Sequence, residues 1–209
     1  MIIESEVPKI LIQELNFKTS DLDKLYKFKM ELLSYNKRYN LISKSTENVI
    51  WSRHILDSAQ LVKFIDFNSD KNLIDIGSGG GFPGLILSIF NSNPKFHVKL
   101  YEKSNVKLDF LNKMVDLLDI ECSVAKNIND DQIINCDYLT SRAFKKLPEI
   151  LNISREKIKI SHKIIILKGK SAQEEINKAS KNESLKYKLF DSMTDKESKI
   201  IIVDAIKSE

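Results

Sequence analysis

Five glycines fall within the eight residues from Gly77 to Gly84, and this loop constrains the fold more than any other stretch of the chain. An apolar run at 73–76 precedes the loop, and a second apolar run at 85–90 follows it. Glycine permits positive φ without steric cost and lets a ligand approach the backbone closely. A helix N-terminus also presents unpaired N–H groups. The stretch therefore predicts a buried strand, a tight ligand-binding loop and the start of a helix.

The rest of the chain alternates between short apolar runs and longer amphipathic runs. Before residue 72, the spacing predicts helices over 4–15, 21–39 and 46–65, with Ser20 and Asp23 as a capping-box-like start of the second. After residue 72 we expect strands at 73–76, 96–101, 122–125, 136–141 and 164–167. We expect helices at 84–91, 105–118, 147 into the 150s and 171–181, the last of them capped by Ser171 and Glu174. A hairpin formed by 185–190 and 199–203 should close the domain. Strands separated by helices imply a parallel sheet. The predicted fold class is α/β, a Rossmann-like sheet domain over 69–209 with an N-terminal helical cap over 1–68 packed on it.

The composition is that of an ordinary globular protein, with 42% hydrophobic and 30% charged residues among 209. The first six residues carry acids where a signal peptide needs a basic segment, and no apolar run reaches the ~18 residues of a membrane span. We therefore expect a cytoplasmic protein without a membrane partner. Cys122 and Cys136 form no C-x-x-C pair and the three histidines are scattered, so we expect cysteines buried in strands and no metal site.

The net charge of +4 is unevenly distributed along the chain. Residues 141–209 hold 16 Lys and Arg against 10 Asp and Glu, whereas 71–140 hold 7 against 9. This mild excess suits a phosphate-rich partner, although many lysine-rich proteins bind none. If they share a face, a run of cations would give RNA phosphates a footing: Lys145, Lys146, Arg155, Lys157, Lys159, Lys163, Lys168 and Lys170.

Three kinds of ligand compete for the glycine loop: the phosphates of a P-loop, a dinucleotide and a methyl donor. A P-loop needs Gly-Lys-Ser/Thr at its end, and the residues at 83–85 supply neither lysine nor hydroxyl. The dinucleotide pattern G-x-G-x-x-G is matched over 79–84, but a loop this rich in glycine matches it easily by chance. An ordinary glycine-rich turn that binds no ligand is a further alternative.

Asp75 separates these alternatives. A carboxylate just before the glycines would repel a pyrophosphate, whereas it would attract the cationic amino-acid part of S-adenosylmethionine. Glu102 ends the next predicted strand, where an acid accepts hydrogen bonds from ribose hydroxyls in many nucleotide folds, so it does not discriminate. The acid-and-glycine pattern, which includes Gly77 and Gly79, therefore favours a methyl donor over a dinucleotide.

The extended loop Asp-Ile-Gly-Ser-Gly-Gly-Gly-Phe-Pro-Gly at 75–84 closely resembles that of the bacterial RsmG (GidB) family. Further matches follow in order, at Tyr-Asn-Leu (39–41), Arg-His-Ile-Leu-Asp-Ser (53–58), Ser-Arg-Ala-Phe (141–144) and Leu-Lys-Gly (167–169). The resemblance covers essentially the whole chain. It implies the class I S-adenosylmethionine-dependent methyltransferase fold and methylation of guanine N7 in 16S ribosomal RNA, with free RNA or the small ribosomal subunit as partner.

The resemblance also assigns residues to the site. It places Gly77 and Phe82 against the methyl donor, Glu102 at the ribose and Arg142 on the cofactor side. After the third strand the family commonly reads Arg-Ala-Glu, whereas this chain has Lys-Asn-Ile at 126–128, so only backbone contacts from Asn127 and Ile128 are expected. Facing the substrate we place Asn40, Arg53, His54, Lys168 and Lys170. For Arg53 and His54 a structural role is an equal alternative, with Asp57 as a partner of His54 at i+3.

Guanine N7 is a lone-pair acceptor without a proton, so its methylation needs no general base. The chain has no recognisable Ser-His-Asp or Cys-His arrangement, and we assign no catalytic acid or base. A methyltransferase of a small molecule or a protein on the same fold stays an alternative. Two further alternatives are an NAD-linked oxidoreductase and a non-enzymatic nucleotide-binding module. A monomer is the default expectation.

Overall fold

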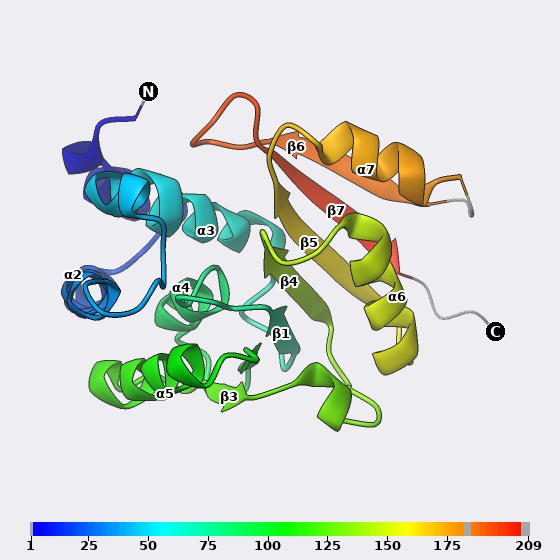
Figure 1. Ribbon diagram of the computed structural model, residues 1–209, viewed down its shortest axis with the longest axis horizontal. Coiled ribbons are helices and arrows are strands. Elements are labelled where there is room, and N and C mark those ends of the chain that lie inside the picture. Colours follow the sequence, from blue (N-terminus) through cyan, green and yellow to red (C-terminus); the bar gives the residue numbers. More distant parts are fainter. Residues whose placement is uncertain (1, 182–184, 206–209) are drawn as a thin grey trace.

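A single twisted sheet organises the computed structural model, which describes residues 2–181 and 185–205 (Figure 1). Its strands are β1 (Asn72–Ile76), β2 (His97–Tyr101), β3 (Ser123–Ala125), β4 (Tyr138–Arg142), β5 (His162–Lys168), β6 (Tyr187–Asp191) and β7 (Lys199–Ala205). They lie in the order β3-β2-β1-β4-β5-β7-β6. The first five are parallel, and β7 runs antiparallel to both β5 and β6. The order reverses direction beside β1, which is where open α/β sheets bind their ligands.

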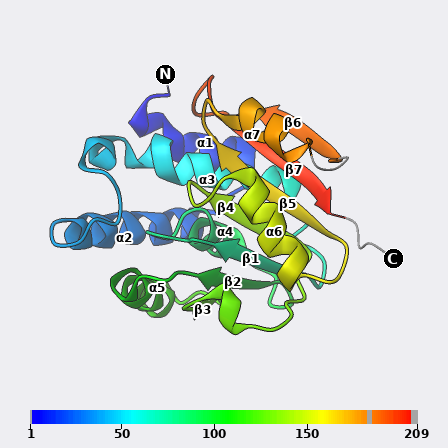
Figure 2. The same cartoon turned by 45° about the vertical axis from the view of Figure 1, so that its right-hand side comes forward.

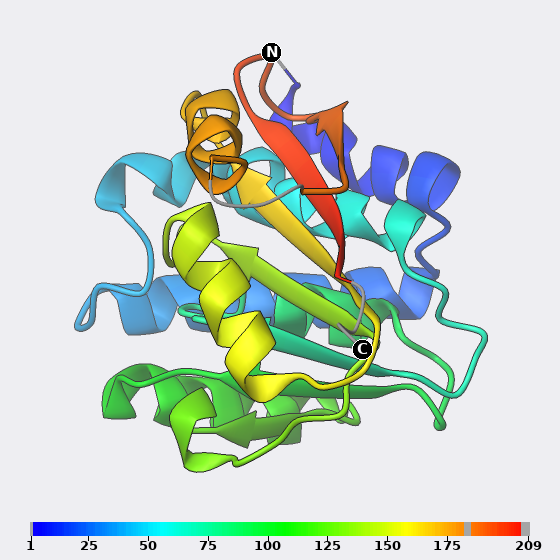
Figure 3. The ribbon, with the colours of Figure 1, turned by 90° about the vertical axis from the view of Figure 1, so that its right-hand side faces the viewer.

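Helices cover both faces of the sheet. The helices between strands are α4 (Gly84–Phe90), α5 (Asn105–Leu118), α6 (Leu147–Lys157) and α7 (Ala172–Ala179). Strand β5 shows the two-sided burial: Ile165 and Leu167 join the core with α4 and α5, whereas Ile164 and Ile166 join the core with α6 and α7. Successive side chains of a strand point to opposite faces, so this unbroken apolar run fits a strand covered on both sides. Figure 3 shows α6 and α7 in front of the sheet and the N-terminal helices behind it.

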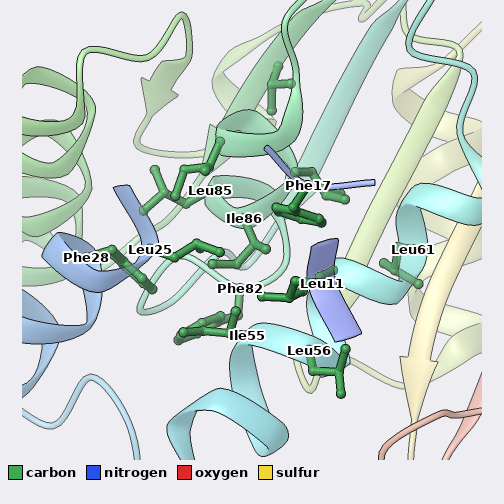
Figure 4. Packing of buried hydrophobic residues seen from close by; sticks show 14 of the residues in the cluster. Leu11, Phe17, Leu25, Phe28, Ile55, Leu56, Leu61, Phe82, Leu85 and Ile86 are labelled. Carbon is green, nitrogen blue, oxygen red and sulfur yellow. The ribbon is translucent and has the colours of Figure 1, made fainter. Parts of the chain in front are cut away.

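The N-terminal segment packs on the face that carries α4 and α5. It comprises the short turn η1 (Glu4–Glu6), the helices α1 (Val7–Leu15) and α2 (Thr19–Asn36), and then η2 (Lys44–Val49), η3 (Trp51–Leu56), α3 (Asp57–Ala59) and η4 (Gln60–Phe64). Phe28 of α2 lies against Phe82 of the glycine loop, with ring centres 5.4 Å apart. Figure 4 shows Leu11, Leu25 and Ile55 in the same cluster as Phe82 and Leu85. The N-terminal helices and the glycine loop therefore share one hydrophobic core.

The helix predicted as one unit over 46–65 is instead a helical run whose turns change width. Its middle, η3, is a π-helix between two 3₁₀ segments. The carboxylate of Glu4 accepts hydrogen bonds from the backbone N–H groups of Trp51 and Ser52, at 2.9 and 2.8 Å. These N–H groups are diverted from the helix ladder, so the helix restarts at η3. Wide turns of this kind are frequent at functional sites.

Both predicted capping boxes are wrong. Helix α2 begins earlier, and the carboxylate of Asp21 accepts the N–H of Lys18 at 2.8 Å, so Ser20 and Asp23 play no capping part. At α7 the hydroxyl of Ser171 donates to Glu175 at 2.9 Å rather than accepting a backbone N–H. The N–H of Leu147, at 2.7 Å, and the ammonium of Lys168, at 2.9 Å, hold the Glu175 carboxylate beside Ser171. The strand placement of the cysteines is wrong as well: Cys122 precedes β3 and is only half-buried, and Cys136 is buried ahead of β4.

Candidate cofactor and substrate site

A cavity of about 360 Å³ opens at the carboxyl ends of β1, β2 and β4. Four loops of the sheet form its wall: the glycine loop, the end of β2, the segment after β3 and the segment after β4. Leu41, Ile42 and His54 close it from the N-terminal helices. Its place matches the crevice in which open α/β folds hold nucleotide-like ligands.

The backbone of the glycine loop is shaped by positive φ angles. Gly77 has φ +74°, Gly79 +58° and Gly81 +100°. The loop is tied to the end of β2, because the N–H groups of Gly77 and Ser78 donate to the carbonyl of Tyr101 at 2.9 and 3.1 Å. At Gly77 a side chain is excluded a second time, since a Cβ would lie 2.2 Å from the ring of Phe144. The expected positions of Gly77, Gly79 and Phe82 on the cavity wall are therefore where the structure has them.

Asp75 lies behind this loop and does not line the cavity. Its carboxylate is fully buried and accepts hydrogen bonds from the N–H of Gly84 at 3.1 Å and the hydroxyl of Thr140 at 3.0 Å. Burial raises the pKa of Asp75 to about 6, and the hydrogen bonds hold it from rising further. The residue fixes the start of α4 against β1, so it contacts the loop rather than a ligand in the cavity.

Glu102 does face the cavity, as expected. One carboxylate oxygen accepts the N–H of Gly79 at 2.8 Å and the other accepts the N–H of Ser104 at 2.8 Å. Each oxygen of an ionised carboxylate has two lone pairs, so each keeps one for a ligand hydroxyl. Asn127 and Ile128 line the same cavity from the segment after β3, and the Asn127 side chain is held by the N–H of Asn129 at 3.1 Å.

Arg142, at the end of β4, ties the sheet to the N-terminal helices. Its guanidinium donates to the carbonyl of Arg53 at 3.0 Å and to Nδ1 of His54 at 2.7 Å, and it pairs with the carboxylate of Asp57 at 3.4 Å. It also lies over the ring of Phe82, 4.8 Å from the ring centre. Asp57 is therefore the partner of Arg142, and the expected i+3 pairing of Asp57 with His54 is replaced by this bridge.

The C-terminal hairpin supports the same cluster. Asp57 accepts a hydrogen bond from the hydroxyl of Thr194 at 2.9 Å. Gln60 donates to the hydroxyl of Ser192 at 3.0 Å and accepts the N–H of Met193 at 2.8 Å. The turn between β6 and β7 thus holds Asp57, and Asp57 in turn holds Arg142.

A second cavity, of about 440 Å³, lies on the other side of this cluster. The two cavities share the wall formed by His54, Arg142 and Ala143. The second is polar, with Arg53, Asp57 and Lys168 among its lining residues. The two cavities stand side by side at the ends of β4 and β5, an arrangement that suits a cofactor beside its substrate.

The remaining predicted substrate residues occupy different surroundings. Asn40 is exposed, next to the cavity residue Leu41 but not in the wall itself. Arg53 is half-exposed and lies 3.5 Å from the carboxylate of Asp195. Lys168 is buried and lies 2.9 Å from Glu175, whereas Lys170 is exposed and lies 2.7 Å from Glu197. The structure therefore presents Lys168 within an internal ion pair rather than as a cation open to RNA.

Sequence reasoning missed several residues of the walls. Leu41, Ile42, Thr46, Lys103, Lys107 and Phe144 line the two cavities. Lys103 and Lys107 follow Glu102 at the start of α5, so their place was the easiest to foresee. Leu41 and Thr46 come from the segment between α2 and η3, whose path over the sheet no local pattern indicates.

Within residues 2–181 and 185–205, no three His, Cys, Asp or Glu side chains gather as a metal site would need. No helix in these ranges is both long and apolar enough to cross a membrane.

The Rossmann-like sheet and the glycine-loop cavity beside Glu102 define a protein that holds a nucleotide-like cofactor at the carboxyl ends of parallel strands. The family model for rRNA small subunit methyltransferase G matches residues 21–201. The chain belongs to this family. Ribosomal RNA small subunit methyltransferase G of Rickettsia felis is 37% identical over 198 residues, covering 95% of this chain and 95% of that protein. The protein of the same name from Rickettsia akari is 37% identical over 182 residues, covering 87% and 93%.

Solved structures agree on the fold. A crystal structure of a SAM-dependent methyltransferase from Aquifex aeolicus has a TM-score of 0.60 and 13% identity to this chain, and the match covers 84% of this chain and 98% of that one. The fold class, the family and the methyl-donor cofactor expected from the glycine loop are therefore confirmed.

Proposed function

We propose that this protein methylates N7 of a guanine in the 16S ribosomal RNA of the small ribosomal subunit. The observation that carries the proposal is the shared wall of two cavities, formed by His54, Arg142 and Ala143. S-adenosylmethionine would occupy the glycine-loop cavity, and the guanine would enter the polar one. The relatives' name supports ribosomal RNA of the small subunit as the substrate.

The residues of the first cavity fit the methyl donor. The free lone pairs of Glu102 suit the two ribose hydroxyls, and the backbone at Asn127 and Ile128 suits the adenine edge. Gly79 leaves room for close approach, because a Cβ there would meet only the carbonyl of Gly77, at 3.8 Å. When bound, this cofactor supplies a sulfonium methyl that the N7 lone pair accepts without loss of a proton from the base.

The chain's own contribution is orientation rather than proton transfer. Arg142 is held from three sides, so it forms a rigid divider between cofactor and base. Burial, reinforced by the charges of Arg142 and Arg53, lowers the pKa of His54 to about 3. A neutral imidazole there adds no positive charge against a purine that becomes cationic on methylation. Arg53 lines the second cavity with a half-exposed side chain, and we expect it to donate to O6 of the guanine.

The decisive experiment is methyl transfer from labelled S-adenosylmethionine to small ribosomal subunits and to protein-free 16S RNA, followed by mapping of the modified base. We expect one N7-methylguanosine in the product RNA. We also expect the enzyme to be a monomer and to act in the bacterial cytoplasm. Methylation of a base other than guanine, or of a small molecule or protein only, would contradict the proposal. Calorimetry with S-adenosylmethionine, S-adenosylhomocysteine and NAD provides the binding control, since tight NAD binding alone would exclude a methyltransferase.

A further inference from the structure

A third hollow, of about 240 Å³, lies where the end of α2 meets the start of α5. Figure 2 shows these two helices side by side at the edge of the molecule toward which β1 and β2 point. The hollow is lined by Ser34, Tyr35, Arg38, Tyr39, Val106 and Asp109. None of these residues belongs to the cofactor cavity or to the polar cavity beside it.

Tyr39 presents an aromatic surface in this hollow. It is 38% exposed, and the guanidinium of Arg38 lies 5.7 Å from its ring centre. Behind it, Tyr35 is fixed by the ring of Phe110 at 5.1 Å and by the ammonium of Lys113 at 4.8 Å. An exposed ring on a rigid support with an adjacent arginine is the arrangement on which single-stranded nucleic acids stack their bases.

Cations without an ion-pair partner lie in and beside this hollow. In the described ranges, Arg38, Lys103 and Lys107 have no ion-pair partner, although Lys103 and Lys107 border both α5 and the cofactor cavity. By contrast, Lys145, Lys168 and Lys170 each lie within 3 Å of a carboxylate. Asp109 is the acid of the hollow, and a carboxylate in such a place can accept an N–H from a base edge.

One loop links the hollow to both cavities. Along residues 38–43, Arg38 and Tyr39 line the hollow, Leu41 and Ile42 line the cofactor cavity, and Ser43 lines the polar cavity. The four Cα-to-Cα steps from Tyr39 to Ser43 span at most ~14 Å. A strand of RNA whose guanine enters the polar cavity therefore has its neighbouring nucleotides within reach of Tyr39.

We propose that Tyr39 and Arg38 bind an unpaired nucleotide that flanks the target guanine, with the base stacked on Tyr39 and its phosphates held by Arg38 and Lys107. This inference rests on the proposed function for the identity of the RNA. It adds the junction of α2 and α5 to the surfaces that would bind RNA. Tyr39 and Arg38 act on substrate affinity and leave cofactor binding alone, since neither side chain lines the cofactor cavity. Lys107 does line that cavity and is therefore left unchanged in the test.

The test compares Tyr39→Ala, Tyr39→Phe and Arg38→Glu with two matched controls. Tyr187→Ala removes a tyrosine of nearly equal exposure, 39%, from the edge strand β6. Lys95→Glu reverses an exposed charge ahead of the amino end of β2. For each variant we would measure KM for small subunits, kcat, the Kd for S-adenosylmethionine, and the Kd for a labelled single-stranded RNA spanning the mapped guanine.

Stacking of one base on an aromatic ring predicts a rise of about ten-fold or more in KM and in the RNA Kd for Tyr39→Ala. Tyr39→Phe keeps the ring and should behave as the wild type. Arg38→Glu should also weaken RNA binding and make it less dependent on salt. All variants should keep the wild-type Kd for S-adenosylmethionine, which also verifies that they are folded.

Unchanged KM and RNA Kd in Tyr39→Ala and Arg38→Glu, or an equal effect of the two controls, would overturn the inference while the proposed function stood. The reverse outcome is equally distinct. If the wild type binds the RNA through Tyr39 but transfers no methyl group to guanine, the proposed function fails and the binding surface remains.

Discussion

The guanidinium of Arg142 donates to Nδ1 of His54 at 2.7 Å, and this contact fixes the protonation state of the imidazole. Arginine has no acceptor, so Nδ1 must carry the lone pair and the proton must reside on Nε2. Nε2 lies 2.8 Å from the hydroxyl of Thr46 and donates to it, and that hydroxyl donates to the carbonyl of Ser43 at 2.8 Å. The polarity of the whole chain of hydrogen bonds follows from one arginine.

This neutral histidine makes the protein sensitive to acid. The pKa of His54 is about 3 in the folded protein against an ordinary 6.5, so the unfolded chain binds the proton first as the pH falls. Stability contributed by neutral His54 is complete above pH 6.5 and is lost between pH 6.5 and 3, by about 5 kcal/mol in all. His54→Gln should abolish that part of the loss in urea titrations. Asp75, whose raised pKa acts in the opposite direction between about pH 4 and 6, is present in both proteins and cancels. Parallel pH profiles of the two proteins would contradict the assignment.

The Arg142 and Asp57 side chains should behave as a coupled pair. Both are largely buried, with 16% and 9% of their surfaces exposed, so removing either leaves a buried charge without its partner. We expect Arg142→Gln and Asp57→Asn each to cost about 3 kcal/mol in unfolding free energy. The double variant should cost clearly less than the two together, because no lone charge remains. Strict additivity would show that the pair contributes no coupling.

Gly77 and Gly79 form a matched pair for testing the loop. Gly77→Ala forces a methyl group against the Phe144 ring in addition to the cost of positive φ, whereas Gly79→Ala meets only the φ cost of about 1 kcal/mol. Gly77→Ala should therefore lower the midpoint temperature of thermal unfolding more than Gly79→Ala does. Phe144→Ala in the Gly77→Ala background should recover part of the difference. Equal destabilisation by Gly77→Ala and Gly79→Ala would show that the Phe144 ring moves aside without a measurable energetic cost.

Glu102 provides a direct test of the cofactor cavity. Glu102→Ala removes both acceptors for the ribose and should weaken S-adenosylmethionine binding about ten-fold or more, as expected for hydrogen bonds to a charged group. Glu102→Gln keeps one acceptor oxygen and should fall between Glu102→Ala and the wild type. Calorimetry measures all three, and Glu121→Ala, an exposed acid outside the cavity, is the control. Wild-type affinity in Glu102→Ala would place the ribose elsewhere.

Sequence patterns predicted the sheet, the glycine loop and the place of Glu102 because these depend on local chemistry: apolar alternation, positive φ and the end of a strand. The part of Asp75 could not be foreseen in the same way. Its spacing before the glycines is that of a ligand-facing acid, yet Thr140 and Gly84, which capture it, reach it through the fold. Lys168 likewise reads as an open cation until Glu175, from the following helix, neutralises it. The partners of a charge decide its role, and partners distant in sequence leave no local signal.

The hydrogen bonds from the β6–β7 turn to Asp57 and Gln60 form late in the synthesis of the chain. Thr194 and Met193 emerge from the ribosome long after Arg142 and the glycine loop have done so. A nascent chain that already carries every residue of the cofactor cavity therefore still lacks one of the supports that orient its arginine. The orientation of an arginine in the middle of the sheet thus depends in part on the last strands of the chain to be made.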